Sequence, residues 1–265
     1  MSQDNTGLIA TPWTEWRSAT PARIALGRAG VATPTDESLR FGWAHAMARD
    51  AIHAPLNVDL LEVGLRLAGW EVLRARSRAP DRTTYLRRPD LGRQLHEDDA
   101  QQLRAQASQL PGKPELCLVI GDGLSSLAVQ RHALPLLEAL RAQWPVAGAQ
   151  TPVVIVTQAR VAVADEVGEI LGAGMSTMLI GERPGLSSPD SLGLYLTHGP
   201  RRGRHDAERN CISNVRPEGL SYLSAARKLA WLLRQSQRLG LSGVALKDES
   251  DAVLPLIPAS VPTLS

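Results

Sequence analysis

From Leu116 onward, the chain alternates short apolar runs with longer helix-prone stretches. The apolar runs are rich in β-branched residues and have few alternating polar positions, which is typical of strands covered by helices on both faces of a sheet. Strands are predicted at 116–120, 153–156, 177–180, 192–197 and 243–246, and helices at 126–143, 164–171 and 221–238. Repeated strand–helix units predict an α/β fold with a Rossmann-like, mostly parallel sheet flanked by helices.

The first third of the chain has helical periodicity. A helix is predicted over 33–52, because Thr33 can serve as its N-cap and Pro34 suits its first position. Its apolar stripe consists of Leu39, Trp43, Ala46 and Met47. Further helical patterns cover 57–69 and 90–110, and the part between 74 and 88 has the pattern of a short strand or loop. A mainly helical region therefore precedes the predicted sheet.

Changes in composition divide the chain into four parts. Residues 1–20 are polar and lack clear periodicity, so a flexible arm is expected there. Residues 249–265 are rich in Pro and Ser and are expected to form a tail. Between these ends, we expect a mainly helical N-terminal region over 21–112 and the Rossmann-like domain over 113–248.

The overall composition narrows the class of protein. The formal charge of +2, from 29 basic and 27 acidic residues, gives no reason to expect a nucleic-acid partner. No apolar stretch reaches the roughly 18 residues that a membrane-spanning helix needs. Of the two cysteines, Cys117 lies in an apolar run, so a disulfide framework is not expected and a reducing cytoplasm fits. The six histidines show no metal-ligand spacing, so no metal site is predicted.

Basic residues outnumber acidic residues between Arg201 and Arg238. Such an excess indicates either a surface that meets phosphate, carboxylate or an acidic protein, or a solvated basic face. The helix predicted over 221–238 leaves a similar choice. Its Trp231 among arginines would suit a partner subunit, whereas its apolar stripe also fits a half-buried helix.

The loops that follow the strands are the candidate ligand-binding segments. In open α/β sheets, ligands bind beyond the carboxyl ends of the strands, near the switch in strand order. By this rule the candidate segments are 121–125, 158–161, 181–188 and 209–214. We expect them to converge on one edge of the sheet.

The first of these segments, Gly121-Asp-Gly-Leu-Ser, resembles a phosphate-cradling turn. It falls short of the G-x-G-x-x-G pattern, because Ser126 occupies the place of the last glycine. The segment predicts either a stand-alone nucleotide-binding α/β enzyme or a tight turn capped by Ser125 or Asp122.

Glu182 and Cys211 carry the remaining candidate chemistry. Glu182 could pair with Arg183 or Arg160 and be structural, or it could accept hydrogen bonds from the amide groups of a ligand. Cys211, in a segment with the polarity of a loop, could be a nucleophile, a soft contact or a small buried residue. Nucleophilic catalysis is disfavoured, because no histidine forms a recognisable catalytic arrangement with it.

Several longer segments together resemble one known family, the small (light) subunit of ethanolamine ammonia-lyase, from about residue 20 to 248. These segments are ARIALGRAG (22–30), LRFGWAHA (39–46), RPDLGR (88–93), VIGDGLS (119–125), DEVGEILGA (165–173), LIGERPGL (179–186) and ERNCISNV (208–215). Several long segments in the right order are far more specific than any single short motif.

The resemblance implies an adenosylcobalamin-dependent enzyme that converts ethanolamine to acetaldehyde and ammonia by radical chemistry. It implies that a large barrel subunit holds the substrate and the catalytic residues, and that this chain covers the cobalamin from the other side without catalytic residues of its own. Carried over by position, the cobalamin contacts are Val161, Glu182 and Cys211. The implied assembly is a hetero-oligomer with several copies of each subunit. The alternative is a structural adaptor without cofactor contact.

The resemblance also bears on how cobalamin binds and on where the protein works. The D-x-H-x-x-G element, whose histidine replaces the lower axial ligand in other cobalamin proteins, is absent, and Leu124 stands where that histidine would be. Cobalamin is therefore expected to keep its own dimethylbenzimidazole on cobalt, the base-on mode. A cytoplasmic location is expected. A bacterial microcompartment is the alternative. The N-terminus is shorter than that of enteric members, which argues against this alternative.

Overall fold

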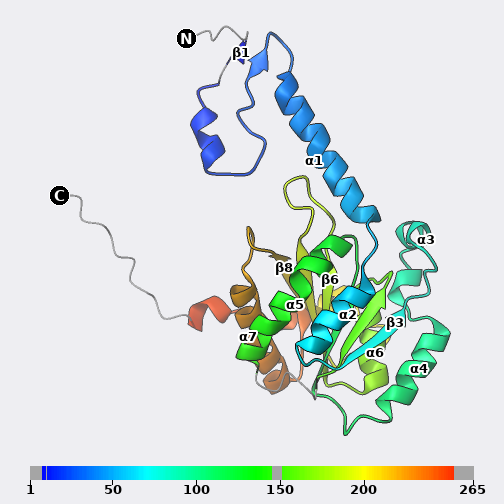
Figure 1. The fold of residues 1–265 in the computed structure, drawn as a ribbon. Helices are drawn as coiled ribbons and strands as arrows, with labels where there is room; N and C mark the ends of the chain where they lie inside the picture. The colour runs from blue at the N-terminus through cyan, green and yellow to red at the C-terminus, as the bar shows by residue number, and fades with distance from the viewer. Residues whose placement is uncertain (1–7, 10, 145–150, 254–265) are drawn as a thin grey trace.

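The computed structural model describes residues 8–9, 11–144 and 151–253. Their centre is a six-stranded sheet with the strand order β3-β5-β4-β6-β7-β8 (Figure 1). The strands are β3 (Val72–Arg76), β4 (Leu116–Gly121), β5 (Val153–Thr157), β6 (Met175–Gly181), β7 (Leu192–His198) and β8 (Arg209–Val215). β3, β5, β4 and β6 pair in parallel, and β7 and β8 extend the sheet antiparallel. The predicted α/β class is confirmed, and the likeness to a Rossmann fold is approximate because of these two antiparallel strands.

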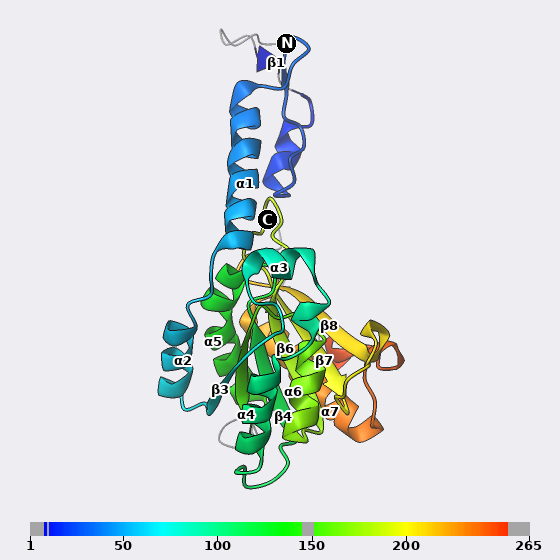
Figure 2. The same ribbon diagram turned by 90° about the vertical axis from the view of Figure 1, so that its right-hand side faces the viewer.

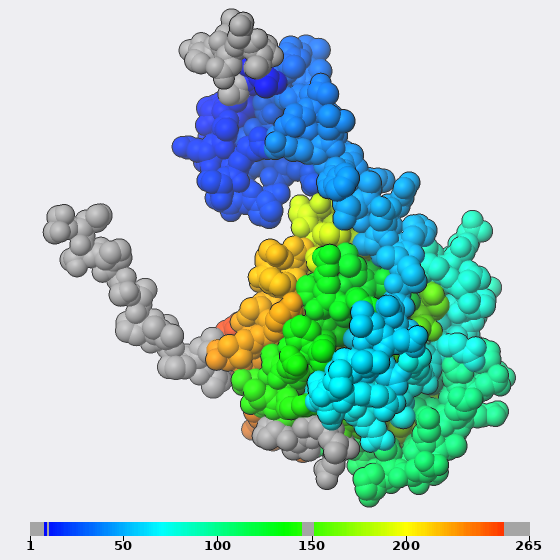
Figure 3. Space-filling model, viewed as in Figure 1, coloured from blue at the N-terminus to red at the C-terminus, as the bar shows by residue number. Residues whose placement is uncertain are grey.

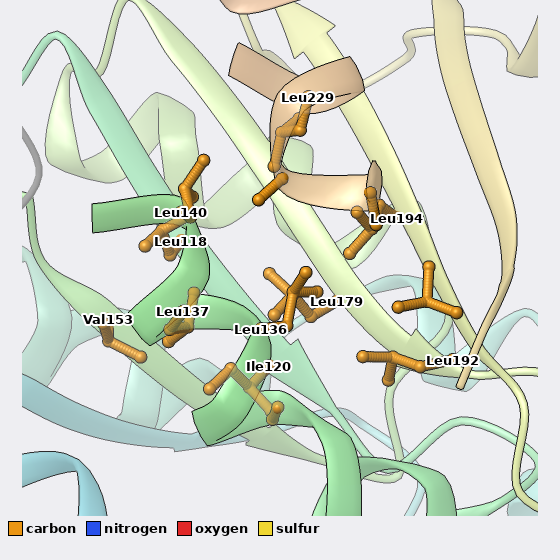
Figure 4. Packing of buried hydrophobic residues seen from close by; sticks show 14 of the residues in the cluster. Leu118, Ile120, Leu136, Leu137, Leu140, Val153, Leu179, Leu192, Leu194 and Leu229 are labelled. Atoms are coloured by element: carbon orange, nitrogen blue, oxygen red, sulfur yellow. The ribbon is translucent and has the colours of Figure 1, made fainter. Parts of the chain in front are cut away.

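Helices cover both faces of this sheet. The helices are α1 (Thr35–His53), α2 (Val58–Leu67), α3 (Arg82–Arg87), α4 (Glu97–Ala107), α5 (Ser126–Gln143), α6 (Val163–Leu171) and α7 (Tyr222–Leu239). On one face, leucines of α5 and α7 pack against β4, β6 and β7, as Leu137, Leu229 and Leu194 illustrate (Figure 4). On the other face, α4 and α6 bury a second cluster, which includes Leu103 and Val167. Every residue of β4 and β6 is buried, which explains the apolar run of β4 and that of β6 after Thr177.

Capping residues fix several helix ends where the sequence indicates them. The Ser221 hydroxyl caps α7 by accepting from the Ser224 amide over 3.2 Å, and Gly240 ends that helix with a φ of +68°. In α1 the prediction is wrong by one position, because Pro34 rather than Thr33 is the N-cap and no side chain caps this helix end. The helix predicted over 90–110 is shorter, since a 3₁₀ turn at Leu91–Arg93 precedes α4.

The N-terminal segment stands apart from the sheet and its helices (Figures 2 and 3). The short strands β1 (Leu8–Ile9) and β2 (Arg28–Ala29) pair antiparallel, with a 3₁₀ helix at Thr14–Ser18 between them. α1 then leads from this pair to the body of the molecule. Its predicted apolar stripe does not enter the core, because Leu39 is 69% and Trp43 is 71% exposed.

Two predictions near the C-terminus are wrong. Residues 243–246 were expected to form a strand, but Gly243–Ala245 is a 3₁₀ helix that begins at a glycine with a φ of +83°. The Asn210 side chain supplies a hydrogen-bond donor to this segment, because its amide donates to the Leu246 carbonyl over 2.7 Å. Residues 209–214, expected to be a loop, lie in β8, which is the edge strand of the sheet.

Candidate functional site

The carboxyl ends of β4, β5 and β6 lie at one edge of the sheet, because these strands pair in parallel. β8 runs in the same direction as β6, since each of them is antiparallel to β7. Hydrogen bonds join the connections at this edge. The Ala159 amide donates to the Asp122 carboxylate over 2.9 Å, and the Leu124 amide donates to the Gly181 carbonyl over 2.9 Å. The predicted convergence is confirmed for 121–125, 158–161 and the start of 181–188, whereas 209–214 runs along β8 and reaches this edge only with Ser213 and Asn214, which bind Glu182.

The Gly121-Asp-Gly turn is filled by the protein itself. A Cβ added at Gly123, whose φ is +57°, would lie 2.2 Å from the Gly181 oxygen, and a Cβ at Gly181 would lie 2.0 Å from the Ser125 oxygen. The Ser125 hydroxyl caps α5 by accepting from the Ala128 amide over 3.3 Å. Backbone contact between this turn and the end of β6 requires these glycines, so the geometry favours a tight capped turn over a phosphate cradle.

An open cavity of about 650 Å³ extends from this edge along β7 and β8. Its wall is formed by Pro89, Asp90, Arg93, Arg160, Val161, Ala162, Tyr195, Asp206, Arg209 and Cys211. Val161 and Cys211 therefore face one cavity, although 50 positions separate them in the chain. Glu182 is not part of the wall. The assignment of these three residues to a ligand stays a prediction.

Glu182 has hydrogen-bond partners within the chain. Its carboxylate accepts from the hydroxyls of Ser191 and Ser213 and from the Asn214 amide over 3.1 Å. It thereby fastens the start of the β6–β7 connection to β8. Among the described residues no arginine lies within ion-pair distance of it, so the pairing with Arg183 or Arg160 considered from the sequence is wrong. An ionised carboxylate can accept about four hydrogen bonds, so these three contacts do not use its full capacity.

Cys211 lies opposite Tyr195 in the β7–β8 register, at the cavity wall. Although the residue as a whole is exposed, burial of its surroundings raises the pKa of the Cys211 thiol. The nearby Glu182 carboxylate raises that pKa further, and a hydrogen bond with Tyr195 offsets the increase only in part. A thiol with a raised pKa is a poor nucleophile at neutral pH. Cys211 is therefore suited to contact a ligand rather than to attack it.

Sequence reasoning missed the contact between Tyr85 and Arg160. Tyr85 is fully buried in α3, and its hydroxyl donates to the Ala159 carbonyl over 3.0 Å. The Arg160 guanidinium carbon lies 4.3 Å from the centre of the Tyr85 ring. Burial raises the pKa of Tyr85 to about 12, so the phenol stays neutral at physiological pH. No local sequence signal marks this contact, because the two residues are 75 positions apart.

Most basic residues between Arg201 and Arg238 have structural partners. Ion pairs join Arg202 to Glu166, Arg204 to Glu208, Arg209 to Asp165, Arg216 to Asp190 and Lys228 to Asp251. The local excess of positive charge is therefore largely compensated by carboxylates of this chain. This arrangement favours a structural explanation over a dedicated anion-binding surface along this segment.

A cluster around Asp190 anchors the far end of the β6–β7 connection. Arg131 and Arg216 form ion pairs with Asp190 over 2.8 and 3.2 Å. His132, buried in α5, lies 3.5 Å from Asp190 through Nε2 and 2.8 Å from the Tyr222 hydroxyl through Nδ1. Burial lowers the pKa of His132, although Asp190 opposes that change.

The lowered pKa of His132 predicts a pH-dependent stability. The unfolded chain binds a proton at this residue near pH 6.5, whereas the folded chain binds it only at lower pH. The free energy of unfolding should therefore fall as the pH drops below about 6.5, by at most about 1.4 kcal/mol per pH unit for this one proton. Urea unfolding at pH 7, 6 and 5 measures the slope. His132→Asn should flatten it, and His45→Asn, at an exposed residue of α1, should leave it unchanged. Equal slopes in all three proteins would contradict the assignment.

Comparison with known proteins decides the family. The sequence model of the ethanolamine ammonia-lyase light chain matches residues 10–247. The chain belongs to this family. The ethanolamine ammonia-lyase small subunit of Azotobacter vinelandii is 57% identical over 249 residues, which cover 94% of this chain and 92% of that protein. The small subunit of Pseudomonas fluorescens is 57% identical, with 90% and 88% covered, and that of Pseudomonas syringae pv. tomato is 54% identical, with 94% and 86% covered.

The range that matches the light-chain family includes all residues of the cavity and most of the N-terminal segment. The match begins at residue 10, earlier than the resemblance from about residue 20 that the motifs indicate. It includes the residues of α1. No helix among the described residues has both the length and the apolar character to span a membrane.

Proposed function

We propose that this chain is the small subunit of an adenosylcobalamin-dependent ethanolamine ammonia-lyase, which converts ethanolamine to acetaldehyde and ammonia by radical chemistry. The family match over residues 10–247 carries this proposal. The relatives are named small subunits, which supports a large subunit as partner, and we assign the catalytic residues to that partner. We propose a hetero-oligomer located in the cytoplasm, with a bacterial microcompartment as the alternative that cell fractionation would distinguish.

Exposed apolar side chains support the large subunit as a binding partner. Leu39, Phe41 and Trp43 are exposed on α1, and Trp13 and Trp16 are exposed in the segment before it. A group of large apolar side chains that the described residues leave exposed is typical of a protein interface. The surface fits a partner that buries these residues during assembly.

The cavity wall fits one face of a corrin. Val161, Ala162 and Pro89 offer apolar surface, and Cys211 and Tyr195 add polarisable and hydrogen-bonding groups. Arg160 lines the wall without an ion-pair partner among the described residues, so an acceptor group of a ligand has a place beside its guanidinium. When bound, adenosylcobalamin supplies the cobalt–carbon bond whose homolytic cleavage starts the radical chemistry. The cavity is open on the side away from this wall, which leaves the other face of the cofactor to the large subunit.

The chain's own residues would hold and orient this cofactor. We assign to Glu182 the acceptance of a hydrogen bond from a corrin amide side chain, and to Val161 and Cys211 contacts at the cavity wall, in part through the backbone. The described residues that line the cavity include no histidine, which supports base-on binding. Electron paramagnetic resonance of cob(II)alamin bound to the complex tests this point. Nitrogen splitting from a protein histidine rather than from dimethylbenzimidazole would contradict it.

Glu182→Gln should weaken cobalamin binding about tenfold or more. A hydrogen bond to a charged group contributes on the order of 1.5 to 3 kcal/mol, and the amide cannot accept on its NH₂ side. The dissociation constant is measured by equilibrium dialysis of cyanocobalamin against the co-expressed complex. Glu138→Gln, at an exposed glutamate of α5, is the matched control. An unchanged dissociation constant in a complex of normal stability would refute the role of Glu182.

Co-expression with the large subunit tests the function as a whole. The complex should release ammonia from ethanolamine only when adenosylcobalamin is present, and this chain alone should release none. Nucleotide binding or ammonia release by the isolated chain would favour the alternative of a stand-alone enzyme. A structure of the complex with this chain far from the corrin would favour an adaptor without cofactor contact.

A further inference from the structure

Arg160 is held in place without a carboxylate partner. Its guanidinium carbon lies 4.3 Å from the centre of the Tyr85 ring, and its Nη2 donates to the Tyr85 carbonyl at the long distance of 3.5 Å. Its backbone amide donates to the Gly92 carbonyl over 2.8 Å, which fixes the base of the side chain. Across the described residues, no Asp or Glu lies within ion-pair distance of it, and its Nε is buried without a partner. A positive charge is therefore fixed at the cavity wall and left unneutralised.

The other arginines of the cavity differ in this respect. Arg209 is neutralised by Asp165 and by Asp206, the latter over 2.7 Å, and Arg93 lies 3.9 Å from Asp206. Both therefore have a carboxylate nearby that competes with any anionic ligand. Arg160 has no such competitor in the part of the chain that the structure describes.

The N-terminus of α6 adds positive potential at the same place. The helix begins at Val163, and Val161 and Ala162, the two residues before it, line the cavity. Ala162 is the N-cap and has no capping side chain, and the amides of Val163, Ala164 and Asp165 donate to the carbonyls of residues 160–162 over 3.0 to 3.2 Å. The acidic residues of the first turn, Asp165 and Glu166, are buried and paired with Arg209 and Arg202. The first amides of α6 are therefore occupied within the chain, and this helix end adds the positive potential of its dipole to the charge of Arg160 but offers no free donor.

We propose that Arg160 binds a phosphodiester of the ligand, with the N-terminus of α6 behind it. This inference rests on the proposed function. The phosphodiester is the anionic group of the nucleotide loop of cobalamin, whereas the side chains of the corrin end in neutral amides. A guanidinium stacked on an aromatic ring presents a planar fork that matches two phosphate oxygens, and its geometry is set before the ligand arrives. Arg160 is thus a binding residue that distinguishes corrinoids with a nucleotide loop from those without one.

Two corrinoid probes separate this role from a general contact with the corrin. Cyanocobalamin carries the phosphodiester, and dicyanocobinamide keeps the corrin and its amides but lacks the nucleotide loop. Equilibrium dialysis of each probe against the complex with the large subunit gives the dissociation constant without an activity measurement. Arg160→Gln should weaken cyanocobalamin binding about tenfold or more and leave cobinamide binding unchanged. Arg160→Lys should weaken cyanocobalamin binding less, because it keeps the charge and loses the planar fork.

The controls separate the possible failures. Arg87→Gln, at an exposed arginine of α3, should change neither dissociation constant. The phosphodiester contact is overturned if the Arg160 variants weaken the binding of cyanocobalamin and of dicyanocobinamide equally. It is also overturned if neither dissociation constant changes. In both cases the proposed function stands. If the wild-type complex binds neither probe, the proposed function itself is wrong, and this inference falls with it.

Discussion

Arg209→Met is expected to lower the free energy of unfolding by about 3 to 5 kcal/mol. The Arg209 and Asp165 side chains are each 2% exposed, and the ion pair between them joins the start of β8 to the first turn of α6. Removing the guanidinium leaves the Asp165 carboxylate buried without its counter-ion. Because a folded domain is stable by only about 5 to 15 kcal/mol, this loss would unfold a substantial fraction of a marginal protein.

The double variant Asp165→Leu/Arg209→Met tests whether the unpaired charge causes that loss. Replacing both members of a buried pair with apolar residues is often neutral or stabilising. Arg209 Nε and Asp165 Oδ1 already lack hydrogen-bond partners among the described residues, so the native pair is incompletely satisfied. We expect the double variant to recover most of the stability in urea unfolding at pH 7. Arg88→Met, which removes an exposed pair with Asp90, should cost less than about 1 kcal/mol. A double variant no more stable than Arg209→Met would contradict this account.

The sequence predicts those parts of the fold in which local pattern and burial agree. β4 and β6 are buried on both faces, so their apolar runs identify them without ambiguity. The ends of α7 are predicted for a similar reason, because Ser221 and Gly240 carry signals that act within one helical turn.

Other parts depend on contacts that no local pattern contains. β8 has polar residues at most positions, since it is an edge strand with only Arg209, Ile212 and Val215 buried, and its sequence resembles a loop for this reason. The stripe of α1 has helical period, but periodicity cannot tell whether an apolar face meets its own core or solvent.

The candidate site likewise has parts that the sequence predicts and parts that depend on distant contacts. The ends of the parallel strands are predictable from topology, and the segments at 121–125 and 158–161 do meet there. Two of the internal partners of Glu182, Ser213 and Asn214, lie more than 30 positions away, in a strand that the sequence does not reveal. The stacking of Arg160 on Tyr85 likewise joins two segments that are distant in the chain. Such side-chain contacts follow from packing of the whole fold rather than from spacing.

Gly123→Ala and Gly181→Ala are each expected to destabilise the chain by about 2 kcal/mol or more. The added methyl at Gly181 would lie 2.0 Å from the Ser125 oxygen and 2.7 Å from the Asp122 oxygen, and these atoms belong to the backbone and cannot rotate away. At Gly123, a contact of 2.2 Å with the Gly181 oxygen adds to the cost of a φ of +57°. Gly123→Ala should therefore be the more damaging change, as measured by urea unfolding.

Gly112→Ala is the matched control for these two variants, because nothing lies within 4 Å of the added methyl and its φ is outside the left-handed region. It should change stability by less than about 1 kcal/mol, in the stabilising direction if at all. The comparison also separates the two interpretations of the turn after β4. If its glycines served only to admit a phosphate, the Gly181→Ala chain, which has no positive φ at that position, would unfold at the wild-type urea concentration and lose only a ligand. If backbone contact with β6 requires them, stability falls in the absence of any ligand, and this is the result we expect.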